Sequence, residues 1–279
     1  MSMNVGKGET LVLIGPNGAG KSTLEKTIVG LYAPTSGSVR VFGKNPASDA
    51  ATRSKIGFVG ENYALYDTMT AMANLVFFSK LYGISTDEAK ERAGALLAEF
   101  GASEFAHRKI GELSRGTRQK IAVCRALMTE PKVLVLDEPT AFLDPGSAEV
   151  LREKLIGMKS TTVVYATQRL DELGRISGSV GLLNRGMLVA KGSLEEIMKM
   201  IKGIEIEVVL ARKPGADKLA MLKTMGAKAT GRRLLFSVSN LAELPELTRT
   251  IASMDLSVLT ISYLNYELGK SEGRDGARQ

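Results

Sequence analysis

Histidine, cysteine and tryptophan are almost missing from this chain of 279 residues, which has one His, one Cys and no Trp. Because Cys124 has no second cysteine to pair with, no internal disulfide can form within the chain. The lone His107 cannot supply a histidine-rich metal site. We therefore expect no zinc chemistry, and we expect His107 to be an ordinary surface residue.

Long apolar runs are missing as well, since none approaches the roughly 18 residues that span a bilayer. The opening residues, MSMNVGKGET, lack the apolar stretch of a signal peptide. We therefore expect a cytoplasmic protein without a membrane span of its own.

The charge is biased toward the basic side, with 37 Lys and Arg against 30 Asp and Glu and a net charge of +7. That balance suits nucleic acid, anionic lipid headgroups or phosphorylated ligands. The basic residues are scattered, which favours a solvated surface, and we do not expect nucleic acid as a partner.

The length and the hydrophobic content of 44% fit one large globular domain, or one with a smaller companion.

Apolar runs alternate with helical patterns over the first two thirds of the chain. Residues 10–14 form a short apolar run that leads into a glycine-rich loop and then a helical pattern. Two further apolar runs, 133–136 and 161–166, flank a helical segment at 146–159. This alternation predicts an α/β fold with a parallel, doubly wound sheet. The helical pattern of residues 62–113 predicts an insert into that fold.

The sequence changes character after a predicted hairpin around Asn184-Arg185-Gly186, and we place the end of the first domain at residue 202. The region beyond it reads as strand, helix, two strands, helix and strand, with helices at 214–225 and 241–254. This order predicts a small ferredoxin-like α+β domain at residues 203–266. Residues 267–279 are predicted to be a disordered tail.

The glycine-rich loop matches the pattern G-x-x-x-x-G-K-[ST] through Gly15, Gly20, Lys21 and Ser22. Glycines let main-chain N–H groups curl around phosphates, and the N-terminus of the following helix adds positive potential. In this pattern the lysine reaches the β- and γ-phosphates and the hydroxyl ligates Mg²⁺. We therefore predict a P-loop NTPase sheet that binds ATP. The predicted nucleotide-binding residues of the loop are Gly15, Pro16, Asn17, Gly18, Ala19, Gly20, Lys21, Ser22 and Thr23.

Two acidic residues end the apolar strand in VLVLDEP, at the edge where open α/β sheets bind ligands. We expect Asp137 to hold the Mg²⁺ shell. Glu138, one residue further on, is placed to orient or deprotonate a water for attack on the γ-phosphate. A strand that simply ends in solvated acids is the structural alternative.

The segment LSRGTRQK lies between these two motifs, and Ser114 can cap the helix that follows it. The three motifs, in this order and spacing, make residues 5–200 resemble the ATP-binding subunits of ABC transporters, which carry LSGGQ-like motifs at this place. The resemblance implies that Ser114 and Gly116 bind the γ-phosphate of ATP on the opposite protomer, in a head-to-tail dimer that encloses two ATP molecules. Asp144, in Leu143-Asp144-Pro145, matches the family's D-loop.

Arg115 and Thr117, together with the small C-terminal domain, look most like the multidrug and sodium exporter branch of this family. The resemblance implies ATP and Mg²⁺ as cofactors, integral membrane permease subunits as partners, and a location on the inner face of the cell membrane. It leaves open a homodimer or a heterodimer with another ATP-binding subunit. The candidate surface for the membrane partner, which could equally be core of the helical insert, consists of Tyr63, Leu65, Tyr66 and Met69.

Two catalytic positions depart from the family pattern. Glu61 stands where the family has glutamine, and its carboxylate can still coordinate Mg²⁺. As a third acid near Asp137 and Glu138, it is expected to raise the pKa of at least one of them. Gln168 stands where the resemblance places a switch histidine, and it can donate a hydrogen bond to phosphate but carries no charge.

A third departure concerns the region before the glycine-rich loop, where the family stacks adenine on an aromatic residue. Only 14 residues precede Gly15, and none of them is aromatic. We therefore expect that the N-terminal strands are missing, that a sheet edge is unpaired, and that ATP affinity is weaker by about 1 to 3 kcal/mol.

The leading prediction is an ATP-hydrolysing subunit that powers an export-type ABC transporter through ATP-driven dimerisation. The alternative is a nucleotide-sensing subunit that hydrolyses slowly and donates Ser114 and Gly116 to a competent partner in a heterodimer. A third possibility is a non-transport ABC protein that acts on DNA or ribosomes. Against it, the chain has no long coiled-coil insertion and no duplicated ATPase domain.

Overall fold

The computed structural model describes residues 1–176, 178–239 and 243–268, and the chain divides into two compact units. The first unit comprises residues 1–168 and 172–189, and the second comprises residues 169–171 and those from 190 onward. Helix α7 (Leu194–Met200) lies before the predicted boundary at residue 202 but belongs to the second unit. The reason is local, because α7 runs directly into the next strand and contacts it.

The first unit is built on a six-stranded sheet in the order β2-β3-β4-β1-β5-β6. Strands β2, β3, β4, β1 and β5 are parallel to their neighbours, as the alternating pattern predicts. Strand β1 is therefore paired on both sides, and the edges of the sheet are β2 and β6. The strand bounds are β1 Thr10–Ile14, β2 Ile56–Val59, β3 Val133–Asp137, β4 Thr162–Thr167, β5 Ser179–Asn184 and β6 Met187–Gly192.

The predicted hairpin is present between β5 and β6, where Arg185 and Gly186 form the turn with φ values of 47° and 78°. Two consecutive residues with positive φ match the twist of a tight hairpin, and glycine takes the second position without strain. The main-chain N–H of Gly186 donates to the carbonyl of Ala19 at 2.9 Å, so this turn also supports the glycine-rich loop.

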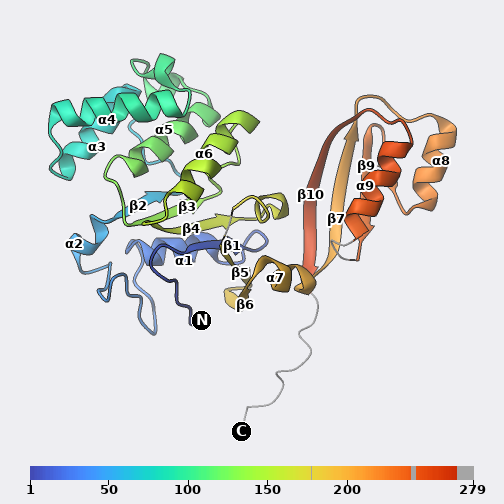
Figure 1. Ribbon diagram of the computed structural model, residues 1–279, viewed down its shortest axis with the longest axis horizontal. Coiled ribbons are helices and arrows are strands. Elements are labelled where there is room, and N and C mark those ends of the chain that lie inside the picture. The colour runs from blue at the N-terminus through green and yellow to red at the C-terminus, as the bar shows by residue number, and fades with distance from the viewer. Residues whose placement is uncertain (177, 240–242, 269–279) are drawn as a thin grey trace, which may run out of the picture. The chain divides into compact units, whose positions relative to one another are not determined.

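Helices lie on both sides of the strands: Figure 1 shows α1 on one side and α5 and α6 on the other. The predicted helical insert consists of α3, α4 and two short 3-10 turns, η1 and η2, and α3 and α4 contact each other and α5. The helix bounds of the first unit are α1 Lys21–Ile28, α2 Ala50–Arg53, α3 Ala71–Leu81, α4 Thr86–Glu99, η1 Ser103–Phe105, η2 Ile110–Glu112, α5 Arg115–Leu127 and α6 Pro145–Gly157. The short turn η3 Leu170–Glu172 has residues of both units.

Five of these helices begin at a residue whose side chain accepts a main-chain N–H of the first turn. These residues are Asp49 for α2, Thr70 for α3, Ser85 for α4, Ser114 for α5 and Asp144 for α6. Such a cap satisfies one otherwise unpaired donor and stabilises a helix by about 1 kcal/mol. The caps fix where α5 and α6 begin, and both beginnings matter for the site.

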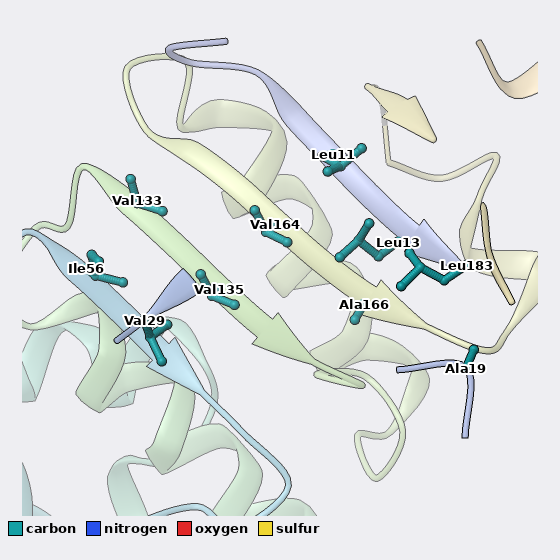
Figure 2. Close-up of a cluster of buried hydrophobic side chains, with 10 residues drawn as sticks. All are labelled: Leu11, Leu13, Ala19, Val29, Ile56, Val133, Val135, Val164, Ala166 and Leu183. Carbon is teal, nitrogen blue, oxygen red and sulfur yellow. The ribbon is translucent and has the colours of Figure 1, made fainter. Parts of the chain in front are cut away.

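The alternate strand residues are buried on both faces of the parallel strands, and one part of the core of the first unit lies against one of these faces. Alternate residues of β1, β3 and β4 project from this face, and Val29, after α1, packs among them (Figure 2). Burial of one such valine or leucine side chain stabilises the fold by about 1.5 to 3 kcal/mol. The cluster consists of Leu11, Leu13, Ala19, Val29, Ile56, Val133, Val135, Val164, Ala166 and Leu183.

The second unit contains a four-stranded sheet in the order β10-β7-β9-β8, with every neighbouring pair antiparallel. Its described elements follow the order predicted for residues 203–266. Helix α9 begins at Leu244, and residues 241 and 242 of the predicted helix lie outside the described residues. The predicted tail began too early, because residues 267 and 268 pair with β7 as the end of β10, and its remainder, 269–279, lies outside the described residues. The bounds are β7 Ile201–Leu210, α8 Ala216–Thr224, β8 Lys228–Thr230, β9 Arg233–Val238, α9 Leu244–Ser253 and β10 Val258–Leu268.

Across the described part of the chain, no helix combines the length and the apolar character needed to cross a membrane.

The first unit contains a buried acidic residue on α1. Glu25 is 0% exposed, no donor of the protein reaches either of its carboxyl oxygens, and its carboxyl lies beside that of Asp137. Burial, reinforced by the nearby carboxyl of Asp137, raises the pKa of Glu25 to about 9. Because an isolated charge is very costly in such a place, Glu25 is uncharged in the folded protein at neutral pH.

We expect this group to make the fold less stable as the pH rises. Glu25 binds a proton in the folded state up to about pH 9, whereas in the unfolded chain it loses the proton near pH 4.5. Between these values the folded state holds more protons, so the free energy of unfolding falls by about 1.4 kcal/mol for each pH unit from this residue alone. Urea unfolding from pH 5 to 9, without nucleotide or divalent cation, measures that slope.

The variant Glu25→Gln removes the titrating group and should flatten this part of the slope. Glu153→Gln, an exposed glutamate of α6, is the matched control and should leave the curve unchanged. An identical slope in Glu25→Gln and the wild type would contradict the assignment of a neutral buried acid.

Candidate functional site

The glycine-rich loop joins the end of β1 to the start of α1. Its tip, residues 16–18, is exposed, whereas Gly15 and Ala19 are buried. Gly20 precedes α1 with a φ of 99°, a left-handed conformation that glycine adopts without strain. No side chain caps the helix there, so no side chain competes for the first N–H groups of α1. These donors and the helix dipole form the type of site that binds phosphate groups.

Lys21 folds back over this loop. Its Nζ donates to the carbonyl of Gly15 at 2.7 Å, and that of Pro16 lies at 3.4 Å. Burial lowers the pKa of Lys21, while the nearby acids Glu138, Asp137 and Glu25 act in the opposite direction. A cation held beside the loop in this way is placed to bind the oxygens of a polyphosphate.

Ser22 and Asp137 bring a hydroxyl and a carboxylate together. The Ser22 Oγ donates to Asp137 Oδ2 at 2.7 Å, across from α1 to the end of β3. Hard oxygen donors of this kind are those that Mg²⁺ prefers. Among the described residues, no group of three or more His, Cys, Asp and Glu side chains forms a metal site by itself. The pair therefore fits a Mg²⁺ ion whose remaining ligands come from nucleotide phosphates and water.

Glu138 follows Asp137 with its main chain in the left-handed region, at a φ of 45°. Its Oε2 accepts from Thr167 Oγ1 at 2.9 Å, and its Oε1 accepts from the main-chain N–H of Gln168 at 2.6 Å. Burial raises the pKa of Glu138, although these two hydrogen bonds and Lys21 oppose the shift. A half-buried carboxyl on a strained main chain, held by two donors, is typical of a group positioned for chemistry.

Gln168 contacts Glu138 through its main chain, while its side chain is exposed. This contact does not depend on the residue type at position 168. The departure from histidine therefore leaves the main-chain support of Glu138 intact.

Glu61 lies exposed on the segment after β2. The sequence predicted that Glu61 would raise the pKa of a neighbouring acid, and the pKa of Glu138 is raised, but by burial and by Asp137. The additional acid beside Asp137 is Glu25, which the sequence analysis missed. Glu25 lies one turn after Lys21 on α1, and its residue type gives no sign in the sequence that it is buried.

Ser114 and Gly116 lie at the N-terminal end of α5. The Ser114 Oγ accepts the main-chain N–H of Thr117 at 3.2 Å and lies 2.8 Å from the Thr117 hydroxyl. A Cβ at Gly116 would lie 2.4 Å from the carbonyl oxygen of Phe142, so no side chain fits at this position. The start of α5 is thereby packed against the segment that leads to α6.

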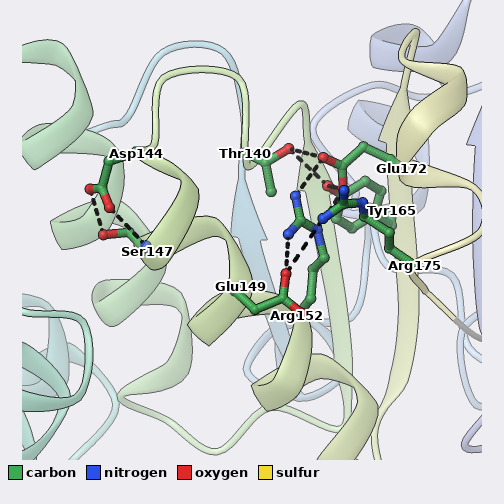
Figure 3. A network of polar contacts seen from close by, with 8 residues as sticks. All are labelled: Thr140, Asp144, Ser147, Glu149, Arg152, Tyr165, Glu172 and Arg175. Carbon is green, nitrogen blue, oxygen red and sulfur yellow. Dashed lines mark hydrogen bonds and ion pairs between the residues drawn. The ribbon is translucent and has the colours of Figure 1, made fainter. Parts of the chain in front are cut away.

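Asp144 begins α6 in the same neighbourhood. Its Oδ1 accepts from the Ser147 N–H at 2.9 Å and its Oδ2 from the Ser147 hydroxyl at 2.6 Å, as Figure 3 shows. Lys120 of α5 adds an ion pair at 3.1 Å. The Ser147 hydrogen bonds, and then Lys120, hold the pKa of Asp144 well below its usual range, so this carboxylate stays charged.

The predicted site residues thus fall into two groups. The loop, Lys21, Ser22, Asp137, Glu138 and the Gln168 main chain meet at the ends of β1, β3 and β4. Ser114, Gly116 and Asp144 meet at the starts of α5 and α6. Among the described residues, no hydrogen bond or ion pair joins Ser114 or Asp144 to the glycine-rich loop.

Comparison with known proteins identifies relatives that bind ATP by name. A family model described as "ABC transporter" matches residues 1–141. The linearmycin resistance ATP-binding protein LnrL of Bacillus subtilis is 36% identical over 206 residues, which cover 73% of this chain and 66% of LnrL. The ABC transporter ATP-binding protein NatA of the same organism is 32% identical over 76% of this chain and 88% of NatA. The daunorubicin resistance ATP-binding protein DrrA3 of Streptomyces coeruleorubidus is 35% identical over 84% of this chain and 76% of DrrA3.

Two solved structures resemble the first unit closely. An ATP-binding subunit of an ABC transporter aligns with a TM-score of 0.66 and 32% identity over 71% of this chain and 83% of its own. The ATP-binding cassette MJ0796, as a dimer in a post-hydrolysis state with ADP and Pi, aligns with a TM-score of 0.64 and 29% identity over 69% of this chain and 88% of its own. With the phosphate loop, the Ser22–Asp137 pair and the capped α5 in place, these matches show that the chain belongs to the ABC transporter family, as an ATP-binding subunit.

Proposed function

We propose that this subunit hydrolyses ATP in a head-to-tail dimer and thereby powers an export-type transporter. The observation that carries the hydrolytic part is the position of Glu138, with both carboxyl oxygens held beside Asp137 and Lys21. The export direction is supported by the drug-resistance names of the relatives LnrL and DrrA3.

The reaction follows from the residues around the loop. Lys21 and the N–H groups of α1 bind the β- and γ-phosphates. Ser22 and Asp137 would hold Mg²⁺, which would supply neutralising charge to the phosphate oxygens. Glu138 orients a water molecule and accepts its proton as the water oxygen bonds to the γ-phosphorus. The bond to the bridging oxygen breaks, and ADP leaves. A raised pKa makes Glu138 a stronger base near neutral pH.

The variant Glu138→Gln tests this role. It keeps the size of the side chain but cannot accept the proton, so the rate of ATP hydrolysis should fall about 100-fold or more while ATP affinity stays within a few-fold of the wild type. Steady-state phosphate release and fluorescent-nucleotide binding measure the two quantities. Unchanged hydrolysis in Glu138→Gln would remove Glu138 from the mechanism.

The alternative function is a nucleotide-sensing subunit that hydrolyses slowly and works with a competent partner in a heterodimer. The side chains of Gln168 and Glu61 are exposed, and neither contacts Glu138. These two side chains therefore do not help to hold Glu138 in place, which favours slow hydrolysis. The variants Gln168→His and Glu61→Gln separate the two functions. If both variants hydrolyse ATP faster than the wild type, the natural subunit is a slowed enzyme. If the wild type is active and neither variant is faster, the leading function is supported.

The dimer places Ser114 and Gly116 on the γ-phosphate of the other protomer. Its support is the dimeric ABC cassette MJ0796 with ADP and Pi, which shares the fold of the first unit. In this chain, Ser114 and Gly116 are fixed by the α5 cap and by close contact with Phe142 rather than by the loop of their own protomer.

We expect ATP to convert Glu138→Gln from monomer to dimer, because binding continues without turnover. Adding Ser114→Asp should abolish that dimer, since aspartate caps a helix as well as serine but sets a negative charge against the partner's phosphate. Ser85→Asp, the equivalent change at the start of α4, is the control and should leave the dimer intact. Light scattering with ATP measures both, and a dimer that survives Ser114→Asp would rule out this contact.

The proposed membrane partner is an integral permease subunit, which would hold the chain on the inner face of the membrane. A groove of about 430 Å³ offers a place for it, with Glu61, Phe58, Phe78 and Tyr82 in its lining. Beside it, Tyr66 stacks on Phe78 at 5.6 Å and is 49% exposed. Exposed aromatic surface next to a groove is typical of an interaction site.

Arg125 of α5 shapes one wall of this groove. Its guanidinium donates to the carbonyls of Phe58 at 2.9 Å and Ala64 at 3.0 Å, and it lies 5.0 Å from the Phe78 ring. The Arg125 side chain thus hydrogen-bonds to the main chain on both sides of Glu61. Of the candidate contact residues, Tyr63, Leu65 and Met69 are half-buried, so they contribute to the local core as well.

The variant Tyr82→Asp introduces a charge at the groove and should release the chain from the membrane fraction of cells that contain its permease. Phe42→Asp changes an aromatic of similar exposure, 49% against 47%, outside the groove and should have no effect. Flotation of membranes followed by immunoblotting measures the bound fraction. Equal loss in both variants, or in neither, would exclude the groove as the contact.

The second unit is proposed to be a ferredoxin-like accessory domain. The support is its element order together with the antiparallel strand order β10-β7-β9-β8.

A further inference from the structure

A cluster of four buried polar side chains lies near the ends of β3 and β4. Thr140, Tyr165, Glu172 and Arg152, here called the Glu172 cluster, are exposed by 3%, 0%, 0% and 5% (Figure 3). Buried polar groups at this depth are costly unless every one finds a partner.

Glu172 is the centre of the cluster and uses both carboxyl oxygens. Its Oε1 accepts from Thr140 Oγ1 at 3.1 Å and from an Arg152 Nη at 2.9 Å. Its Oε2 accepts from the Tyr165 hydroxyl at 3.1 Å and from Arg152 Nε at 3.1 Å. The Thr140 and Tyr165 hydroxyls also lie 3.1 Å apart. Such a closed network is rigid, because moving one member breaks bonds to the others.

The cluster joins the segments on either side of the catalytic contacts. Thr140 follows Glu138 by two residues on the loop after β3. Tyr165 precedes Thr167 by two residues on β4, and Glu172 follows Gln168 by four. Every main-chain segment that supports the Glu138 carboxyl is therefore tied to the same buried carboxylate.

This arrangement matters because the contact from Gln168 to Glu138 is made by the main chain. A side chain can rotate into place, but a main-chain N–H is aimed only by the path of its segment. Glu138 itself sits at a φ of 45°, a conformation that persists only where the surroundings impose it. The position of the Glu138 carboxyl thus depends on how firmly both segments are anchored.

We propose that Glu172 and Tyr165 are positioning residues for Glu138: through Thr140 on one side and the segment of Gln168 on the other, they hold the carboxyl in line for hydrolysis. The kinetic part of this inference rests on the proposed ATPase function. The structural part, which concerns the Gln168 N–H, does not.

The variant Tyr165→Phe tests the proposal with a minimal change, because it removes one hydroxyl and keeps the buried ring. Single-turnover hydrolysis of bound ATP should fall about 10-fold or more, since small misplacements of a catalytic group are costly, while ATP affinity stays within about twofold. Amide hydrogen exchange of residues 166–172 should accelerate, whereas exchange in β1 and β3 stays as in the wild type.

The matched control is Glu149→Gln. Glu149 pairs with the same Arg152 at 2.6 Å, but from the exposed side, and it touches none of the other three cluster residues. Hydrolysis and exchange should both stay at the wild-type level. If Tyr165→Phe fails to fold, Glu172→Gln, which keeps the shape of the side chain, takes its place.

Two results would overturn the proposal. One is a Tyr165→Phe variant with wild-type exchange at residues 166–172. The other is faster exchange throughout β1, β3 and β4, which would mean that the cluster only stabilises the fold. A wild type that does not hydrolyse ATP would defeat the proposed function, yet the exchange measurement would still decide whether the cluster anchors the Gln168 segment.

Discussion

The register of three parallel strands is the constraint on which the site depends. Strand β4 pairs with β1 so that Ile14 lies opposite Thr167, and with β3 so that Asp137 lies opposite Ala166. All three strands consequently end at one level, where β1 leads into the glycine-rich loop and β3 and β4 end at Asp137 and Thr167. Because a slip of one residue would turn the buried side chains to the other face, the apolar core in effect sets the distances between the catalytic groups.

Much of this architecture can be predicted from the sequence. The apolar run at residues 10–14, the glycine-rich loop and the acidic end of the strand at Asp137 predict the parallel sheet and its edge without any long-range information. The helical insert and the cap at Ser114 are local features as well, and the cap depends on a side chain that bonds to a main-chain group three residues away.

The parts that could not be predicted depend on contacts between distant segments. Glu25 resembles an ordinary polar residue of a helix until α1 is packed on β3 and β4, which removes it from water. Glu61 follows its strand as expected, but the path of the chain places it in a groove. For Gln168, the sequence directs attention to the side chain, whereas the structure uses its main-chain N–H. Residue types alone do not reveal such a contact.

Helix α5 carries Arg125 near one end and Ser114 at the other. Arg125 bonds to two carbonyls of the segment around Glu61, and Lys120, further along the helix, bonds to Asp144. The helix has 13 residues and is about 20 Å long, and its main chain is hydrogen-bonded from turn to turn. A movement of the groove wall that keeps both bonds of Arg125 would therefore displace α5, and with it Lys120 and the Ser114 end of the helix.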